Sequence, residues 1–102
     1  MPVKFEHHVA RANGQRIHYV RAGQGDPVVL LHGFPQTWYM WRKIIPALAE
    51  RYTVIAPDLR GFGESSKPIS GYDKRTVAED IYQLVRGLGF EKIFLVGHDM
   101  AG

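Results

Sequence analysis

The chain contains no cysteine among its 102 residues, which excludes disulfide bonds, zinc–thiolate sites and a thiol nucleophile. It also has no long apolar run, because stretches such as 28–31 and 93–96 are far too short to span a bilayer. Residues 1–10 carry charge and lack the apolar core of a signal peptide. From these absent signals we expect a cytoplasmic protein that does not bind a membrane.

A strong excess of charge of one sign is also missing. There are 13 Lys and Arg residues against 10 Asp and Glu residues, for a net charge of +3 and a pI of about 9.4. The basic residues are scattered, and the adjacent pairs at 42–43 and 74–75 do not extend into polybasic runs. This distribution argues against nucleic-acid binding. The apolar content of 45% and charged content of 23% are ordinary for one small globular domain.

Strand and helix patterns alternate along the chain. We expect strands at 5–12, 15–21, 28–31, 52–57 and 92–96. We also expect a helix at about 38–50 and a second helix that Asp73 or Thr76 caps and that runs to about residue 88. Asn13-Gly14 predicts a tight hairpin turn, and Pro46 is expected to kink or divide the first helix. A hairpin followed by alternating strands and helices predicts an α/β fold with a parallel sheet.

The last strand runs into Gly97-His98-Asp99-Met100-Ala101. This small-x-acid-x-small pattern is typical of a nucleophile elbow, a tight strand-to-helix turn that presents one side chain above the sheet. Serine usually occupies the central place, but a carboxylate is also a competent nucleophile and is already ionised at neutral pH. The alternative is that Asp99 only caps the following helix.

A second motif, His32-Gly33-Phe34-Pro35, follows the first buried strand. In an architecture with a nucleophile elbow, a backbone N–H from this loop and the N–H after the nucleophile form the oxyanion hole. The donors here would be the amides of Phe34 and Met100. The order of motifs and elements favours the nucleophile interpretation of Asp99 over the capping one.

Three segments carry a family resemblance: residues 32–42 (HGFPQTWYMWR), 58–68 (DLRGFGESSKP) and 97–99 (GHD). They resemble the epoxide hydrolase group of the α/β-hydrolases, which is related to the haloalkane and haloacetate dehalogenases. The resemblance covers nearly the whole chain from about residue 5. It implies an antiparallel hairpin leading into a parallel sheet with flanking helices. It also implies one partial domain over 1–102 that reaches the elbow, without the lid and C-terminal part.

The resemblance implies that Asp99 opens an epoxide to form a covalent ester, which water hydrolyses to a diol. Phe34 and Met100 would supply the oxyanion-hole amides, and Phe34, Pro35 and Trp38 would line the pocket. The substrate would be a small apolar electrophile, and neither a cofactor nor a metal is implied. The base histidine, the orienting acid and the lid would lie beyond Gly102, so we expect the isolated chain to be inactive.

Two alternatives remain open. A dehalogenase would use the same nucleophile, but haloalkane dehalogenases usually have Asn at the place of Phe34 and Trp at that of Met100. Haloacetate dehalogenases usually have Arg at the place of Met100. The other alternative is a non-catalytic piece that only pairs with a complementary polypeptide carrying the rest of the fold.

Several other polar and aromatic residues are expected to be structural. His32 is expected to pack or hydrogen-bond within its loop, and His98 is expected to be structural or to line the pocket. The hairpin histidines 7, 8 and 18 show no spacing with acids that predicts a metal site. Trp41 lies at helical spacing and is expected in the core. Asp58 and Arg60 are expected to organise the loop after their strand.

Overall fold

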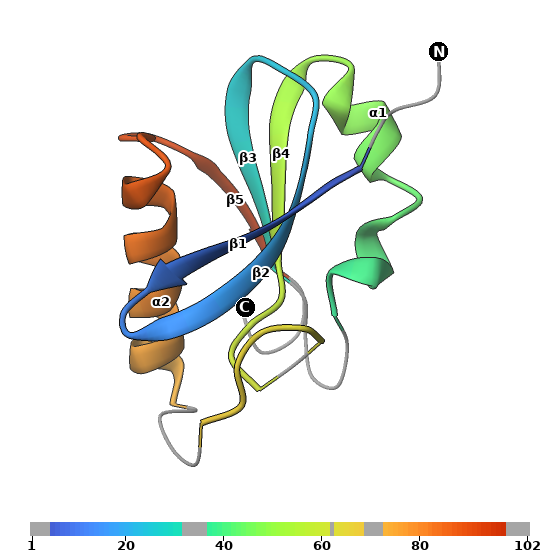
Figure 1. Cartoon of the computed structure of the whole chain (residues 1–102). Coiled ribbons are helices and arrows are strands. Elements are labelled where there is room, and N and C mark those ends of the chain that lie inside the picture. Colours follow the sequence, from blue (N-terminus) through green and yellow to red (C-terminus); the bar gives the residue numbers. More distant parts are fainter. Residues whose placement is uncertain (1–4, 32–36, 62, 69–72, 98–102) are drawn as a thin grey trace.

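The computed structural model describes residues 5–31, 37–61, 63–68 and 73–97. These residues form a five-stranded sheet in the order β1-β2-β4-β3-β5, with helices on both faces (Figure 1). β1 (Glu6–Ala12), β2 (Gln15–Ala22) and β4 (Tyr52–Pro57) pair antiparallel, whereas β3 (Asp26–Leu31) runs parallel to both β4 and β5 (Phe94–Gly97). The predicted α/β class and the hairpin entry are confirmed.

The turn between β1 and β2 is the expected two-residue turn at Asn13-Gly14. Both residues have positive φ, 53° and 75°, a conformation that Asn and Gly tolerate better than other residues. The resulting register pairs Ala12 with Gln15 and Glu6 with Arg21. This register sets which β1 and β2 side chains share a face of the sheet.

Apolar side chains of the sheet are buried on both faces. The core on the α2 side contains Ala12, Ile17, Tyr19, Val29, Ile55, Leu59, Val77, Ile81, Leu84 and Val85. The core on the α1 side contains Val20, Ala22, Val28, Leu30, Trp41, Ile45, Ala49, Val54 and Ala56. Successive β3 residues therefore face opposite cores, which explains the continuous apolar run of that strand. Burial of each large aliphatic side chain contributes about 1.5–3 kcal/mol to this packing.

The segment after Thr37 differs from the single helix that its periodicity predicts. A 3-10 helix, η1 (Trp38–Trp41), is capped by the Thr37 hydroxyl and is followed by the separate short helix α1 (Ile45–Ala49). Pro46 stands in the first turn of α1, where the missing N–H has no intrahelical partner to lose. The helix is divided as expected, but the break falls at residues 42–44, before Pro46, and Trp41 is buried as expected.

The second helix agrees closely with its sequence pattern. α2 (Lys74–Gly87) begins after Asp73, whose carboxylate accepts from the Thr76 amide at 3.0 Å. Its apolar stripe faces the sheet, and Gly89 after its end has a φ of +92°. No helix in the described part of the chain is both long enough and apolar enough to cross a bilayer.

β5 carries the apolar residues of a buried strand but is exposed at one edge of the described sheet. It pairs with β3 on one side and forms the edge of the described sheet on the other. Phe94, Leu95 and Val96 are 60%, 58% and 40% exposed. An exposed apolar edge strand is a template for pairing with another strand.

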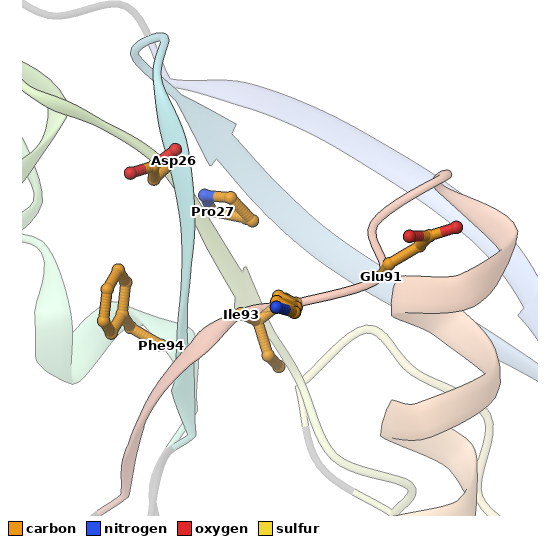
Figure 2. A pocket seen from close by; sticks show the side chains of 6 residues that line it. Asp26, Pro27, Glu91, Ile93 and Phe94 are labelled. Carbon is orange, nitrogen blue, oxygen red and sulfur yellow. The ribbon is translucent and has the colours of Figure 1, made fainter.

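A hollow of about 670 Å³ lies at the amino ends of β3 and β5. Figure 2 shows Asp26 and Pro27 on β3, Glu91 and Ile93 on the segment that enters β5, and Phe94 at the start of β5. These residues stand at the amino ends of the two parallel strands. Ligand sites in open α/β sheets lie outside the carboxyl ends, so this hollow is at the wrong end of the sheet for the predicted chemistry.

We predict that the 102-residue chain produced alone self-associates through β5. Leu95→Lys should reduce this association, because a charged residue on an edge strand opposes edge-to-edge pairing. Size-exclusion chromatography with light scattering measures the association of the wild-type chain and of the Leu95→Lys variant. A monomeric wild-type chain with one cooperative melting transition would contradict the prediction.

The cap of α2 should make stability depend on pH in the acidic range. The Thr76 hydroxyl and amide, which donate to the Asp73 carboxylate, lower the pKa of Asp73 below its ordinary value. A lowered native pKa adds stability above the pKa of the unfolded chain, and this stability is lost as the pH falls through the native pKa. Asp73→Asn keeps a capping oxygen that does not titrate. We expect the wild type to lose free energy of unfolding relative to Asp73→Asn on acidification, measured by urea denaturation across the pH range of Asp titration. If the free energy of unfolding falls equally with pH in the wild type and in Asp73→Asn, the titration of Asp73 does not contribute to the pH dependence of stability.

Candidate active site

The two predicted catalytic motifs follow neighbouring strands of the sheet. Leu31 at the end of β3 is the register partner of Gly97 at the end of β5. Residues 32–36 and 98–102 therefore continue from adjacent carboxyl ends, the edge at which α/β sheets bind ligands. Asp99, Met100, Phe34 and Pro35 themselves lie outside the described residues, and so do His32 and His98.

Trp38 is the predicted pocket residue that the structure describes. Its backbone N–H donates to Asp58 Oδ1 at 2.8 Å. Its half-buried ring makes edge-on contacts with Phe5 and His7, at centroid distances of 5.9 and 5.4 Å. Two contacts therefore hold the start of η1 in place. The Trp38 amide bonds to a carboxylate, and the Trp38 ring packs against two aromatic rings.

Asp58, directly after β4, connects three segments of the chain. Its carboxylate accepts from the Trp38 amide, from the Glu64 amide at 3.1 Å and from His18 Nδ1 at 2.8 Å. The residue is 1% exposed, and a buried carboxylate is costly unless donors surround it. The expected role in the loop after β4 is confirmed, and the structure extends it to β2 and to the start of η1.

Ser65, in the loop after β4, adds hydrogen bonds to the contact between Asp58 and β2. Its hydroxyl donates to the Asp58 carbonyl at 2.6 Å and accepts from the His18 amide at 2.9 Å. The Asp58 amide in turn donates to the His18 carbonyl at 2.8 Å. The loop after β4 is therefore fastened to β2 through both main chain and side chain.

Arg60 anchors the other side of this loop to α2. Its Nε and Nη2 donate to the two carboxylate oxygens of Asp80, both at 2.6 Å, and the pair is buried. Asn13 Nδ2 also donates to Asp80 Oδ1, at 3.0 Å. A two-pronged guanidinium–carboxylate contact fixes orientation as well as distance, so the hairpin turn, the loop and α2 hold one another in place.

Gly63 lies directly over the Asp58 carboxylate. It has a φ of +54°, and a Cβ built there would overlap the carboxylate oxygens. The glycine thus meets two requirements, a left-handed backbone and close passage over Asp58. Neither can be read from the loop sequence, because the approach depends on how the loop folds back.

A cluster of metal-ligating atoms also lies at this junction. Among the described residues, His7, His18 and Glu64 place one candidate ligand atom each within 4.8 Å of one another. The hairpin histidines therefore do meet an acid, contrary to what their spacing predicts. The acid belongs to the loop after β4, so a local pattern in the hairpin could not show it.

The profile of the alpha/beta hydrolase fold family matches residues 26–102. The chain belongs to this family. The mixed sheet, its strand order and the helices on both faces agree with that assignment.

The chain is also similar to individual proteins of this family. The chain is 59% identical to the soluble epoxide hydrolase of Corynebacterium sp. (strain C12), over 100% of this chain and 36% of that protein. It is 45% identical to a fluoroacetate dehalogenase of Burkholderia sp, over 96% of this chain and 34% of that protein. Its fold superposes on the solved structure of the epoxide hydrolase CorEH with a TM-score of 0.92 at 60% identity, over 94% of this chain and 34% of that one. The chain thus spans about a third of the length of the curated relatives it matches.

We predict that Gly63→Ala destabilises the protein more than Gly14→Ala does. Both positions have positive φ, but a Cβ at Gly14 meets nothing within 4 Å. Backbone strain costs about 1–3 kcal/mol at either site, and the Asp58 carboxylate must move in addition at Gly63. Denaturant unfolding of the two variants measures the difference, and equal losses would show that the contact with Asp58 carries no cost.

Proposed function

We propose that the protein carrying this chain hydrolyses epoxides to diols through a covalent ester on Asp99. The observation that carries the proposal is the pairing of Leu31 with Gly97, which sets the His-Gly-Phe-Pro and Gly-His-Asp motifs on adjacent strand ends. The 59% identity to a soluble epoxide hydrolase over the whole chain supports the substrate class.

The first step is attack of an Asp99 carboxylate oxygen on one epoxide carbon. The carbon–oxygen bond of the ring breaks, and its electron pair leaves on the epoxide oxygen, which then takes a proton. A carboxylate needs no base for this step, because it is ionised at neutral pH. The product is a hydroxyalkyl ester of Asp99.

The second step is attack of water on the carbonyl carbon of that ester. The carbonyl oxygen becomes an oxyanion, to which the amides of Phe34 and Met100 donate. When the intermediate collapses, the bond between the carbonyl carbon and the alkyl oxygen breaks. The alkoxide takes the proton that the attacking water gave up and leaves as the diol, and the Asp99 carboxyl group returns to its ionised form by losing a proton to solvent. Loss of one such donor typically costs about 2.7–4 kcal/mol of transition-state stabilisation.

The water in the second step needs a general base. Of the described histidines, His18 is buried against Asp58, and His7 and His8 stand on the hairpin strand β1. None of them follows the nucleophile in the order typical of this fold. We therefore place the base, its orienting acid and the lid in the part of the protein beyond this chain.

A dehalogenase is the second candidate, favoured by the 45% identity to a fluoroacetate dehalogenase. The same attack by Asp99 would displace halide from carbon, and the same ester would follow. The thioether of Met100 cannot hold a substrate carboxylate, as the usual Arg would at that place. This difference ranks the epoxide activity first.

We predict that the complete protein forms a covalent adduct on Asp99 when it is mixed with an epoxide. Rapid quenching and peptide mass spectrometry should find the added mass of the whole epoxide, because ring opening expels no leaving group. Asp99→Asn should abolish both adduct and diol formation. Asp26→Asn, an exposed carboxylate at the opposite end of β3, is the matched control and should retain both.

Parallel incubation with fluoroacetate separates the two candidates. If the protein releases fluoride and forms no diol from epoxides, the dehalogenase proposal holds and the epoxide hydrolase proposal is wrong. An adduct on any residue other than Asp99 would overturn the site assignment.

A further inference from the structure

The cluster of His7, His18 and Glu64 brings two imidazole nitrogens and a carboxylate oxygen close together. His18 Nε2 lies 3.0 Å from His7 Nδ1 and 3.3 Å from Glu64 Oε2. The side chain of His18 is 3% exposed, whereas that of Glu64 is 76% exposed. One buried ring nitrogen thus faces a second ring nitrogen and a carboxylate oxygen.

The contact between His18 and Asp58 decides which ring nitrogen of His18 carries the proton. An ionised carboxylate only accepts, so His18 Nδ1, at 2.8 Å from Asp58 Oδ2, is the donor. In the neutral ring, Nε2 then presents a lone pair toward Glu64. The same lone pair accepts a hydrogen bond from the Nδ1–H of His7 at 3.0 Å, and a bound cation would take the place of that proton.

The spacing of these atoms suits a small divalent cation. Ligands about 2.0–2.1 Å from a tetrahedral zinc lie roughly 3.3 Å apart. The two separations that involve His18 Nε2 are 3.0 and 3.3 Å, and all three candidate atoms lie within 4.8 Å of one another. Two imidazoles and one carboxylate are a donor set that zinc accepts, with water in the fourth position.

The surroundings of the cluster also fit a metal site. Asp58 holds the Nδ1–H of His18, and a carboxylate on the second nitrogen of a ligating histidine fixes the ring and raises its basicity. The His7 ring lies nearly parallel to that of His18, at 18° and with a centroid distance of 5.2 Å, and it also contacts Trp38 edge-on. One buried ligand is therefore rigidly oriented, and the two exposed ligands can adjust to an ion.

We propose that His7, His18 and Glu64 form a binding site for a divalent transition-metal ion, best suited to zinc. The ligands come from β1, β2 and the loop after β4, so a bound ion would tie three segments together beside Asp58 and Trp38. Its effect would be on stability at this junction. The site does not depend on the proposed hydrolysis and takes no part in it.

Isothermal titration calorimetry with zinc chloride on the untagged, chelator-treated complete protein tests the proposal. We expect about one equivalent of zinc to bind at these ligands, and His7→Ala or Glu64→Gln to weaken its affinity about tenfold or more. Zinc should raise the melting temperature of the wild type more than that of either variant. Cobalt(II) should give the visible absorption of a tetrahedral site in the wild type alone.

His8→Ala is the matched control, because His8 neighbours His7 in sequence but contacts Glu6 instead. It should bind zinc as the wild type does. Circular dichroism checks that His7→Ala and Glu64→Gln stay folded, which their exposed positions lead us to expect. Absence of zinc binding, or equal binding by the wild type and both ligand variants, would overturn the proposal and leave the cluster as a hydrogen-bond network.

Discussion

The buried carboxylate of Asp58 is the contact on which the geometry of this chain depends. It stands at the end of β4 and accepts from β2 through His18, from the start of η1 through Trp38, and from its own loop through Glu64. A charge in this position would be strongly destabilising without donors. The three segments are held together because each donates a hydrogen bond that the carboxylate requires.

Packing of the sheet and one buried ion pair stabilise the segments that meet at Asp58. Two apolar cores cover opposite faces, and the buried pair of Arg60 with Asp80 ties the loop after β4 to α2. The carboxyl ends of β3 and β5, paired at Leu31 and Gly97, then form a rigid base for the segments that follow them. Catalytic groups on loops gain their precision from such a scaffold.

Most of the fold could be predicted because its signals are local. Period-two and helical patterns, Asn13-Gly14 and the Asp73 cap all act within a few residues, and the structure confirms each of them. The exposure of β5 depends instead on what lies beside its far edge, which no local pattern shows. Its apolar residues are typical of an interior strand, yet in this chain nothing described covers its far edge.

The sequence by itself determined the α/β class, the order of the elements and the position of the Gly-His-Asp motif after the last strand, because backbone propensity and hydrophobic periodicity are short-range. Tertiary structure alone decided that Gly63 passes over Asp58 and that His7 and His18 meet Glu64. The histidine contacts join residues far apart in the chain, and the contact of Gly63 with Asp58 depends on how one loop turns back on itself. They exist only because the loop after β4 folds back over the hairpin to satisfy one buried carboxylate.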